Sequence, residues 1–196
     1  SLSLMRAYSS LMTDLPGSFG PGWIMTGYDL IPRSNVVPTG FESRGLFAGY
    51  REGTRLTLLT PDGGSASFTF TPQPQGDEQA GVTDYRPAWT PDPDADPDVT
   101  WTLSTSDAVL ELARGVYYER GTGLPYNPAN GGFFGEDAYC LTSSGGQSWQ
   151  YGHEGTLKRV TSGGTALMVT TARLSSPNSP ISKPSLLYTR SGTLGW

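Results

Sequence analysis

The clearest structural signal in this sequence lies in residues 54–71, TRLTLLTPDGGSASFTFT. In its second half Phe68 and Phe70 alternate with serine and threonine, which is the period-two pattern of a strand with one buried face. The first half is rich in leucine and threonine. The PDGG sequence between the halves is typical of a tight turn, because proline presets φ and glycine accepts positive φ. We therefore predict an antiparallel hairpin that pairs residues 54–60 with residues 65–71.

The same pattern continues in the C-terminal half of the chain. Four strand-like segments with short glycine-containing turns follow one another there, at residues 138–142, 147–151, 156–161 and 165–171. Residues 99–104 alternate in the same way, and residues 108–113 lead directly into a β-forming Val-Tyr-Tyr run, so we assign both to strands. The sequence predicts an all-β fold of stacked antiparallel hairpins or a meander, forming a sheet or sandwich with little helix.

Composition supports this fold class. Glycine (26) and proline (16) account for 42 of the 196 residues, which is too many chain breakers for long helices. We expect two irregular surface loops, residues 72–98 and 121–135, inserted into a single β-rich unit that spans residues 1–196. The first residue is not methionine and a strand-like run leads up to Gly195-Trp196, so we expect a fragment of a longer protein.

The charge pattern and the hydropathy argue against two kinds of partner. The net charge is -5 and the only lysines are Lys158 and Lys183, which leaves no basic face for nucleic acid. No run of apolar residues is long enough to span a membrane as a helix. We therefore expect no nucleic-acid binding and no membrane span.

The single cysteine and the single histidine leave little room for nucleophilic or metal chemistry. One cysteine cannot form an internal disulfide, and one histidine cannot form a two-histidine zinc site. If residues 138–142 and 147–151 form a hairpin, Cys140 lies opposite residues 149–151, whereas His153 lies two or three residues beyond that point. We therefore assign both side chains to structural positions and expect no catalytic dyad.

Carboxylates and loop aromatics are the remaining candidates for chemistry. A glycosidase needs two carboxylates held a short distance apart in a cleft, but no spacing selects two of Glu111, Glu119, Glu136 and Asp137. We therefore expect no enzymatic activity, and an enzyme with an unrecognised carboxylate site ranks last of the three hypotheses for the function. Aromatic rings in the two loops could instead stack on sugar faces, and the ligand-binding candidates are Tyr85, Trp89 and Tyr126. A carbohydrate-binding β-sandwich module is thus the alternative function.

The first loop carries alternate carboxylates in PDPDADPD, residues 91–98, and the candidate metal ligands are Asp92, Asp94, Asp96 and Asp98. Calcium loops place carboxylates at every second position. With Asp92 as the first ligand, however, the sixth position requires glycine and holds Pro97, and the twelfth requires glutamate and holds Leu103. Alternating prolines also favour an extended chain. The pattern favours a solvated acidic loop without a cofactor, and calcium binding is the alternative.

Two parts of the sequence resemble the N-terminal region of RHS/YD-repeat proteins. The first is RAYSS at residues 6–10 followed by GSFGPGW at residues 17–23, which is similar to the R-x-Y-x-S and G-x-F-G-x-G-W patterns of that region. The second lies between Tyr139 and Val160 and ends in GTLKRV, with Ser144 where the family pattern has aspartate. The repeat motif itself, G-x-x-x-x-Y-x-Y-D, does not occur.

The resemblance implies a structural function. RHS/YD-repeat proteins form large shells in bacterial polymorphic toxins and in the Tc toxin cocoon, so a chain of this kind is expected to be secreted or exposed at the cell surface. Its partners would be the remaining repeats of the same parent chain and, beyond them, a toxin payload or a cell-surface glycan. The payload and the self-cleaving segment lie further along such chains, so no catalytic residue carries over. We predict a non-enzymatic shell or scaffold module that encapsulates or presents other domains.

Overall fold

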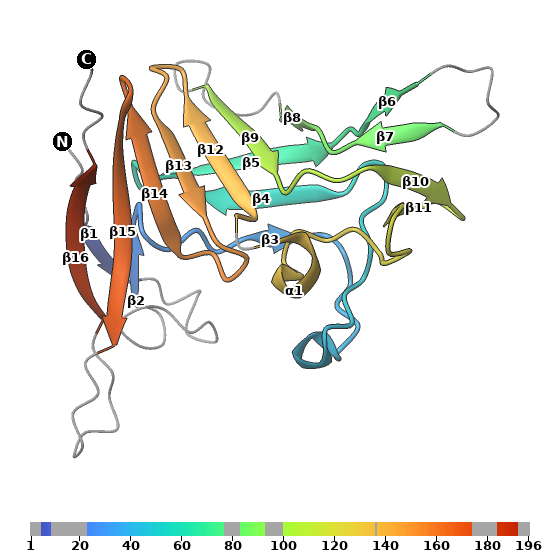
Figure 1. The fold of residues 1–196 in the computed structure, drawn as a ribbon, viewed down its shortest axis with the longest axis horizontal. Coiled ribbons are helices and arrows are strands. Elements are labelled where there is room, and N and C mark those ends of the chain that lie inside the picture. The colour runs from blue at the N-terminus through green and yellow to red at the C-terminus, as the bar shows by residue number, and fades with distance from the viewer. Residues whose placement is uncertain are drawn as a thin grey trace.

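The regular secondary structure of the described residues is nearly all antiparallel β-sheet (Figure 1). The computed structural model describes residues 5–8, 23–76, 83–92, 100–135, 137–173 and 184–191. Helical structure in these residues is confined to a 3₁₀ turn at Glu42–Arg44 and one short helix, α1, at Gly131–Phe134. The predicted all-β fold class is confirmed.

The first large sheet contains the hairpin predicted from residues 54–71. Its strand order is β3-β4-β5-β8, with bounds β3 Arg33–Ser34, β4 Arg55–Leu59, β5 Ser65–Phe70 and β8 Trp89–Pro91. Leu56 pairs with Phe68 and Leu58 pairs with Ala66. All four side chains are buried on one face of the sheet, so the alternation in the sequence set the register.

The second large sheet is the predicted C-terminal meander extended by one strand at each edge. Its order is β16-β15-β14-β13-β12-β9, with bounds β9 Trp101–Thr105, β12 Tyr139–Ser143, β13 Ser148–Tyr151, β14 Leu157–Ser162, β15 Thr165–Arg173 and β16 Pro184–Ser191. Tyr139 pairs with Tyr151 and Leu141 with Trp149, which confirms the predicted pairing of residues 138–142 with 147–151.

The two large sheets pack face to face and enclose the larger core. Figure 1 shows β4 and β5 crossing the strands of the six-stranded sheet at a steep angle. The first sheet supplies Leu56, Leu58 and Phe68 to a buried cluster that Leu141 and Trp149 complete from the second. Burial of each such side chain contributes about 1.5–3 kcal/mol. The sandwich is therefore held together by apolar side chains on the inner faces of the two sheets, which are the apolar positions of the alternating sequences.

A third sheet and a second core lie beside the sandwich. The sheet has the order β11-β10-β7-β6, with bounds β6 Gln73–Gln75, β7 Asp84–Arg86, β10 Leu110–Ala113 and β11 Val116–Glu119. Its core consists of Tyr50, Phe70, Ala108, Leu110, Tyr117 and Tyr126. A two-stranded sheet of β1 Met5–Tyr8 and β2 Trp23–Thr26 completes the described strands. The strand predicted at residues 108–113 is present as β10.

Residues 72–98 are not the irregular loop that we expected. β6, β7 and β8 all form within this segment, and Pro74 and Pro91 both lie in edge strands. Proline lacks the backbone N–H group that a central strand uses for pairing. On the unpaired side of an edge strand, however, no hydrogen bond is lost by its absence. Proline at these positions therefore marks a sheet edge rather than a loop. Residues 77–82 and 93–99 lie outside the described part of the chain.

Residues 121–135 are a surface loop only in part, because residues 121–123, 132, 133 and 135 are exposed whereas the middle of the segment is buried. Tyr126 has an exposed fraction of 0%, and Asn127 and Asn130 are buried with it. The asparagine side chains donate to the backbone of another loop, from Asn127 Nδ2 to the Ala48 carbonyl at 2.9 Å and from Asn130 Nδ2 to the Gly45 carbonyl at 3.4 Å. Because these side chains supply the hydrogen bonds that a buried loop backbone requires, the segment folds inward.

Candidate functional site

The three aromatic residues predicted to bind ligand lie together in the second core. Phe70 is a neighbour of two of them, with ring centroids 5.1 Å from Trp89 and 5.8 Å from Tyr126. Tyr85 packs at 5.3 Å against Tyr117 of the same cluster. Tyr85 and Trp89 are half-buried and Tyr126 is fully buried. Tyr126 therefore belongs to the core rather than to a surface that could stack on a sugar.

A hydrogen-bond chain satisfies the polar groups of Trp89 and Tyr126. Trp89 Nε1 donates to Thr105 Oγ1 at 3.0 Å, and Thr105 Oγ1 lies 3.0 Å from the hydroxyl of Tyr126. That hydroxyl donates to the carbonyl of Ser106 at 2.6 Å. Burial raises the pKa of Tyr126 and of neighbouring Tyr50 well above the ordinary value for tyrosine. Both phenols stay neutral at physiological pH, which suits structural hydrogen bonding.

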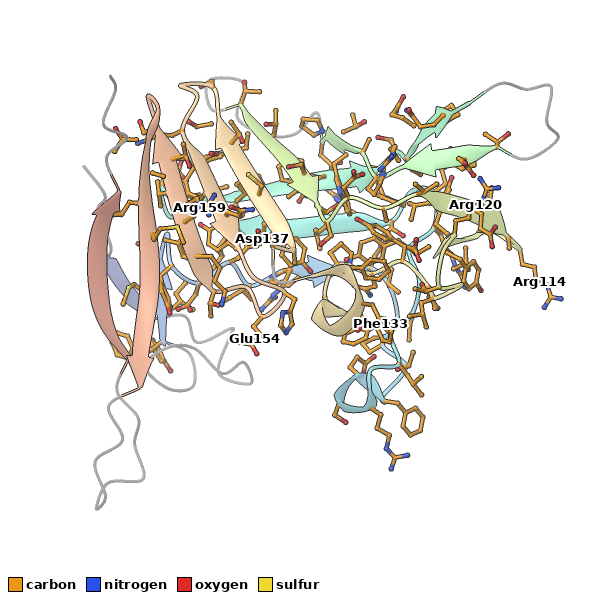
Figure 2. All side chains as sticks on the ribbon, in the orientation of Figure 1. Arg114, Arg120, Phe133, Asp137, Glu154 and Arg159 are labelled. Atoms are coloured by element: carbon orange, nitrogen blue, oxygen red, sulfur yellow. The ribbon has the colours of Figure 1, made fainter. Side chains whose placement is uncertain are left out.

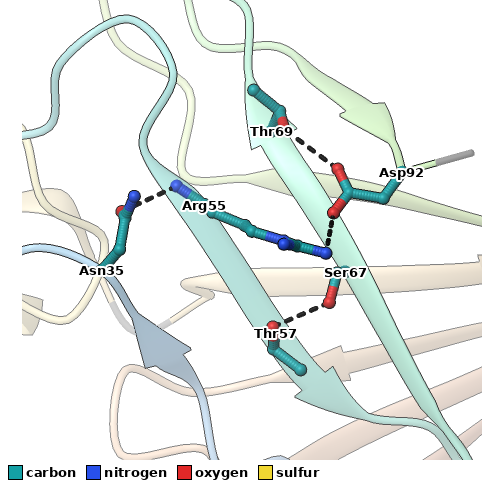
Figure 3. Close-up of polar contacts among 6 residues, drawn as sticks. All are labelled: Asn35, Arg55, Thr57, Ser67, Thr69 and Asp92. Carbon is teal, nitrogen blue, oxygen red and sulfur yellow. Dashed lines mark hydrogen bonds and ion pairs between the residues drawn. The ribbon is translucent and has the colours of Figure 1, made fainter. Parts of the chain in front are cut away.

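Asp92, the first of the candidate metal ligands, is held by protein partners (Figure 3). Its Oδ2 lies 2.5 Å from Arg55 Nη2, and its Oδ1 accepts a hydrogen bond from Thr69 Oγ1 at 2.9 Å. Asp94, Asp96 and Asp98 lie outside the described residues. In the part of the chain that the structure describes, no group of three or more His, Cys, Asp or Glu side chains could hold a metal ion. The calcium alternative thus stays a prediction.

Cys140 and His153 have separate surroundings. Cys140 pairs with Gln150 on one side and with Ser104 on the other, as the hairpin predicts. His153 lies in the turn after β13, where its ring fills the space beside Gly131 so closely that a Cβ there would overlap it. Its Nε2 is 3.8 Å from the carboxylate of Glu154. Each side chain therefore has a packing or pairing role in its own element.

Of the carboxylates considered for glycosidase chemistry, Glu111 and Glu119 lie on the paired strands β10 and β11, where Glu111 is opposite Tyr118 and Glu119 is opposite Leu110. Glu119 accepts hydrogen bonds from the backbone of Gly121 and from both the backbone and the hydroxyl of Thr122. These hydrogen bonds, that from the Thr122 side chain first, lower the pKa of Glu119. Asp137 is exposed near α1, as Figure 2 shows, and Glu136 lies outside the described residues. Glu119 is therefore a turn-capping residue.

A feature that the sequence did not reveal is an open cleft of about 480 Å³ beside β11. Its walls are formed by residues 35–37, 47–49 and 51–54, together with Val116, Tyr118 and Pro125. This volume lies within the range of small-molecule sites. Two regions distant in sequence, residues 35–54 and 116–125, meet here, and neither carries a recognisable motif, so only the fold could assemble the cleft.

Two hydrogen bonds fix a polar group at the rim of this cleft. Asn35 N–H donates to the carbonyl of Arg55 at 3.1 Å, and the Arg55 N–H donates to Asn35 Oδ1 at 2.8 Å (Figure 3). On the opposite wall Gly49 is in close contact with β11, because a Cβ there would lie 2.5 Å from Val116 Cγ1 and 2.9 Å from Pro125 Cβ. The cleft therefore has walls held in place by specific contacts.

Comparisons of the chain with protein-family models, with curated proteins and with solved structures found no match. None of the helices among the described residues is long and apolar enough to cross a membrane. The function is therefore inferred from the geometry of the chain itself.

Proposed function

We propose that this chain is a non-enzymatic structural module, a segment of the shell of a large secreted or cell-surface protein of the RHS/YD-repeat kind. Its role is to encapsulate or present other domains, such as a toxin payload. The similarity of residues 6–10, 17–23 and the segment between Tyr139 and Val160 to that family supports the proposal. The meander β12 to β15 supports it as well, because consecutive hairpins are the unit from which a repeat shell is built.

The observation that carries the proposal is the edge of the six-stranded sheet at β16. β16 is eight residues long and, within the described residues, pairs only with β15. The other edge strands among the described residues are shorter: β3 has two residues, β6 and β8 have three, β1, β2 and β11 have four, and β9 has five. A long strand with one free row of backbone groups accepts a further strand. The next hairpins of the parent protein are the proposed partner.

The test is whether the purified chain adds a strand at β16. We expect concentration-dependent association in size-exclusion chromatography with light scattering, because the free edge recruits another strand. Ser185→Lys with Thr189→Lys should suppress it, since charged side chains protect an edge from pairing. The matched control adds the same two charges away from the edge, at Ser144 in the β12–β13 turn and Ser162 at the end of β14.

Two results would count against the shell. A chain that stays monomeric at every concentration, or one whose association persists unchanged in the β16 variant, would show that the β16 edge does not recruit a further strand. Binding of a defined oligosaccharide on a glycan array would favour the carbohydrate-binding module instead. Circular dichroism of each variant verifies that the β fold is retained.

A further inference from the structure

The cleft beside β11 has features that a purely structural module does not need. We propose that it is a binding site for the carboxylate group of a ligand with an apolar body. The inference is independent of the shell function, because it rests on side chains that face the cleft and not on any sheet edge. Asn35 and Arg51 supply the hydrogen-bond donors.

Two exposed donors at the polar end of the site have no protein partner among the described residues. The Oδ1 atom of Asn35 accepts the Arg55 N–H, while its Nδ2 has no hydrogen-bond partner among the described residues. Arg51 also lines the cleft, and no carboxylate in the described part of the chain pairs with its guanidinium. Its neighbour Arg55, in contrast, is paired with Asp92. A planar guanidinium and an amide N–H₂ group match the two oxygens of a carboxylate.

The charge of the cleft limits the ligand to one negative group. Glu52 lines the same cleft and has no ion-pair partner in the described residues. A ligand with two or more negative charges, such as a phosphate monoester, would be repelled by this carboxylate. Arg51 is the one cationic side chain among the residues that line the cleft and Glu52 offsets its charge, so the guanidinium can hold one carboxylate but the cleft cannot balance a second. A monocarboxylate is thus the anion that the site fits.

The rest of the cleft favours an apolar body. Val36, Phe47, Val116 and Pro125 form the wall beside Gly49, and all four are half-buried and so keep surface exposed to the cleft. Covering such surface contributes about 25 cal/mol per Å². Two sources have this chemistry: a free apolar acid, and the C-terminal residue of a polypeptide, whose carboxylate is recognised in the same way.

The experiment is a titration of the ¹⁵N-labelled chain, followed by NMR. N-acetyl-leucine is the first probe, and N-acetyl-leucinamide, which lacks the carboxylate, is its control. We expect shifts at residues 35–37 and 47–54 with N-acetyl-leucine at concentrations up to about 10 mM, and at least about tenfold weaker binding of the amide. A peptide of about five residues ending in leucine distinguishes the sources: tighter binding than N-acetyl-leucine identifies a polypeptide C-terminus, and equal binding identifies a small acid.

Two variants test the named donors. Asn35→Asp keeps the oxygen that accepts the Arg55 N–H and replaces the free donor with an oxygen, and Arg51→Gln removes the positive charge. Each should weaken binding about tenfold or more, whereas Arg114→Gln, at the exposed tip of the β10–β11 turn (Figure 2), should leave it unchanged. Absence of shifts with both the acid and the peptide, or equal affinities in all three variants, would overturn the proposal. The ¹⁵N spectra themselves show whether each variant is folded.

Discussion

Replacing Tyr126 with phenylalanine tests whether a buried hydrogen-bond chain holds residues 121–135 in the core. The substitution keeps the ring contacts with Phe70 and Tyr50 and removes only the hydroxyl group. That hydroxyl donates to the Ser106 carbonyl at 2.6 Å and lies 3.0 Å from Thr105 Oγ1. Because no methylene is lost from the ring, the change in stability reports on the polar contacts and not on a cavity.

The expected cost follows from the burial of the site. Tyr126 has an exposed fraction of 0%, so water cannot readily replace the lost donor. Leaving a buried carbonyl unpaired costs about 1–3 kcal/mol, and losing the contact with the threonine hydroxyl adds about 0.5–1.5 kcal/mol. We expect the free energy of unfolding to fall by about 1.5–4.5 kcal/mol, which lowers Tm by about 3–18 °C for a chain of this length.

Urea denaturation followed by tryptophan fluorescence measures this change. The matched control is Tyr118→Phe, which removes the hydroxyl of a half-buried tyrosine that makes no side-chain hydrogen bond within the described residues. The control should cost less than about 0.5 kcal/mol. If Tyr126→Phe and Tyr118→Phe lose the same stability, the hydrogen-bond chain does not hold the segment, and ring packing alone does.

Three further predictions concern pH, charge and close packing. Burial raises the pKa of Tyr126, so above about pH 10 the unfolded chain releases a proton that the folded chain keeps, and the protein should lose stability there. Urea titrations at increasing pH should show a shallower loss in Tyr126→Phe. Asp92→Asn should lower the free energy of unfolding by about 0.5–1.5 kcal/mol at low salt and by less at high salt. In the same urea titrations Asp107→Asn should cost almost nothing, because the Asp107 side chain is 75% exposed and that of Asp92 is 13% exposed. Gly131→Ala should cost about 1–3 kcal/mol because its Cβ would overlap the His153 ring, and a double-mutant cycle with His153→Ala should recover most of that loss, while additive costs would contradict the overlap.

The hairpins could be predicted because their determinants are local. In residues 54–71 the apolar period and the turn residues lie within one short segment, and they agree with each other. The burial of Tyr126 could not be predicted in this way. It depends on Asn127 and Asn130, whose side chains bond to Ala48 and Gly45, at sequence separations of 79 and 85 residues. Glycine and proline around Tyr126 correctly indicated a turn but carried no information about whether that turn is buried.

The same difference between local and long-range determinants decides which candidate sites could be predicted. Cys140 was predicted to lie opposite residues 149–151 and pairs with Gln150, because strand pairing follows from the hairpin register. The cleft beside β11 was missed because its donors, Asn35 and Arg51, belong to separate segments that meet only through β4 and the loop before it. Neither residue stands in a pattern that distinguishes it from an ordinary surface side chain.

The position of β5 determines how the whole molecule must melt. This strand contributes Ala66 and Phe68 to the larger core and Phe70 to the second one, and Trp89 on the adjacent strand contacts both clusters. Neither core can open without withdrawing support from the other, so the two behave as one cooperative unit rather than as two independently unfolding halves. Amide protons of β5 should therefore exchange with solvent only through global unfolding and set the upper limit of hydrogen-exchange protection in the chain.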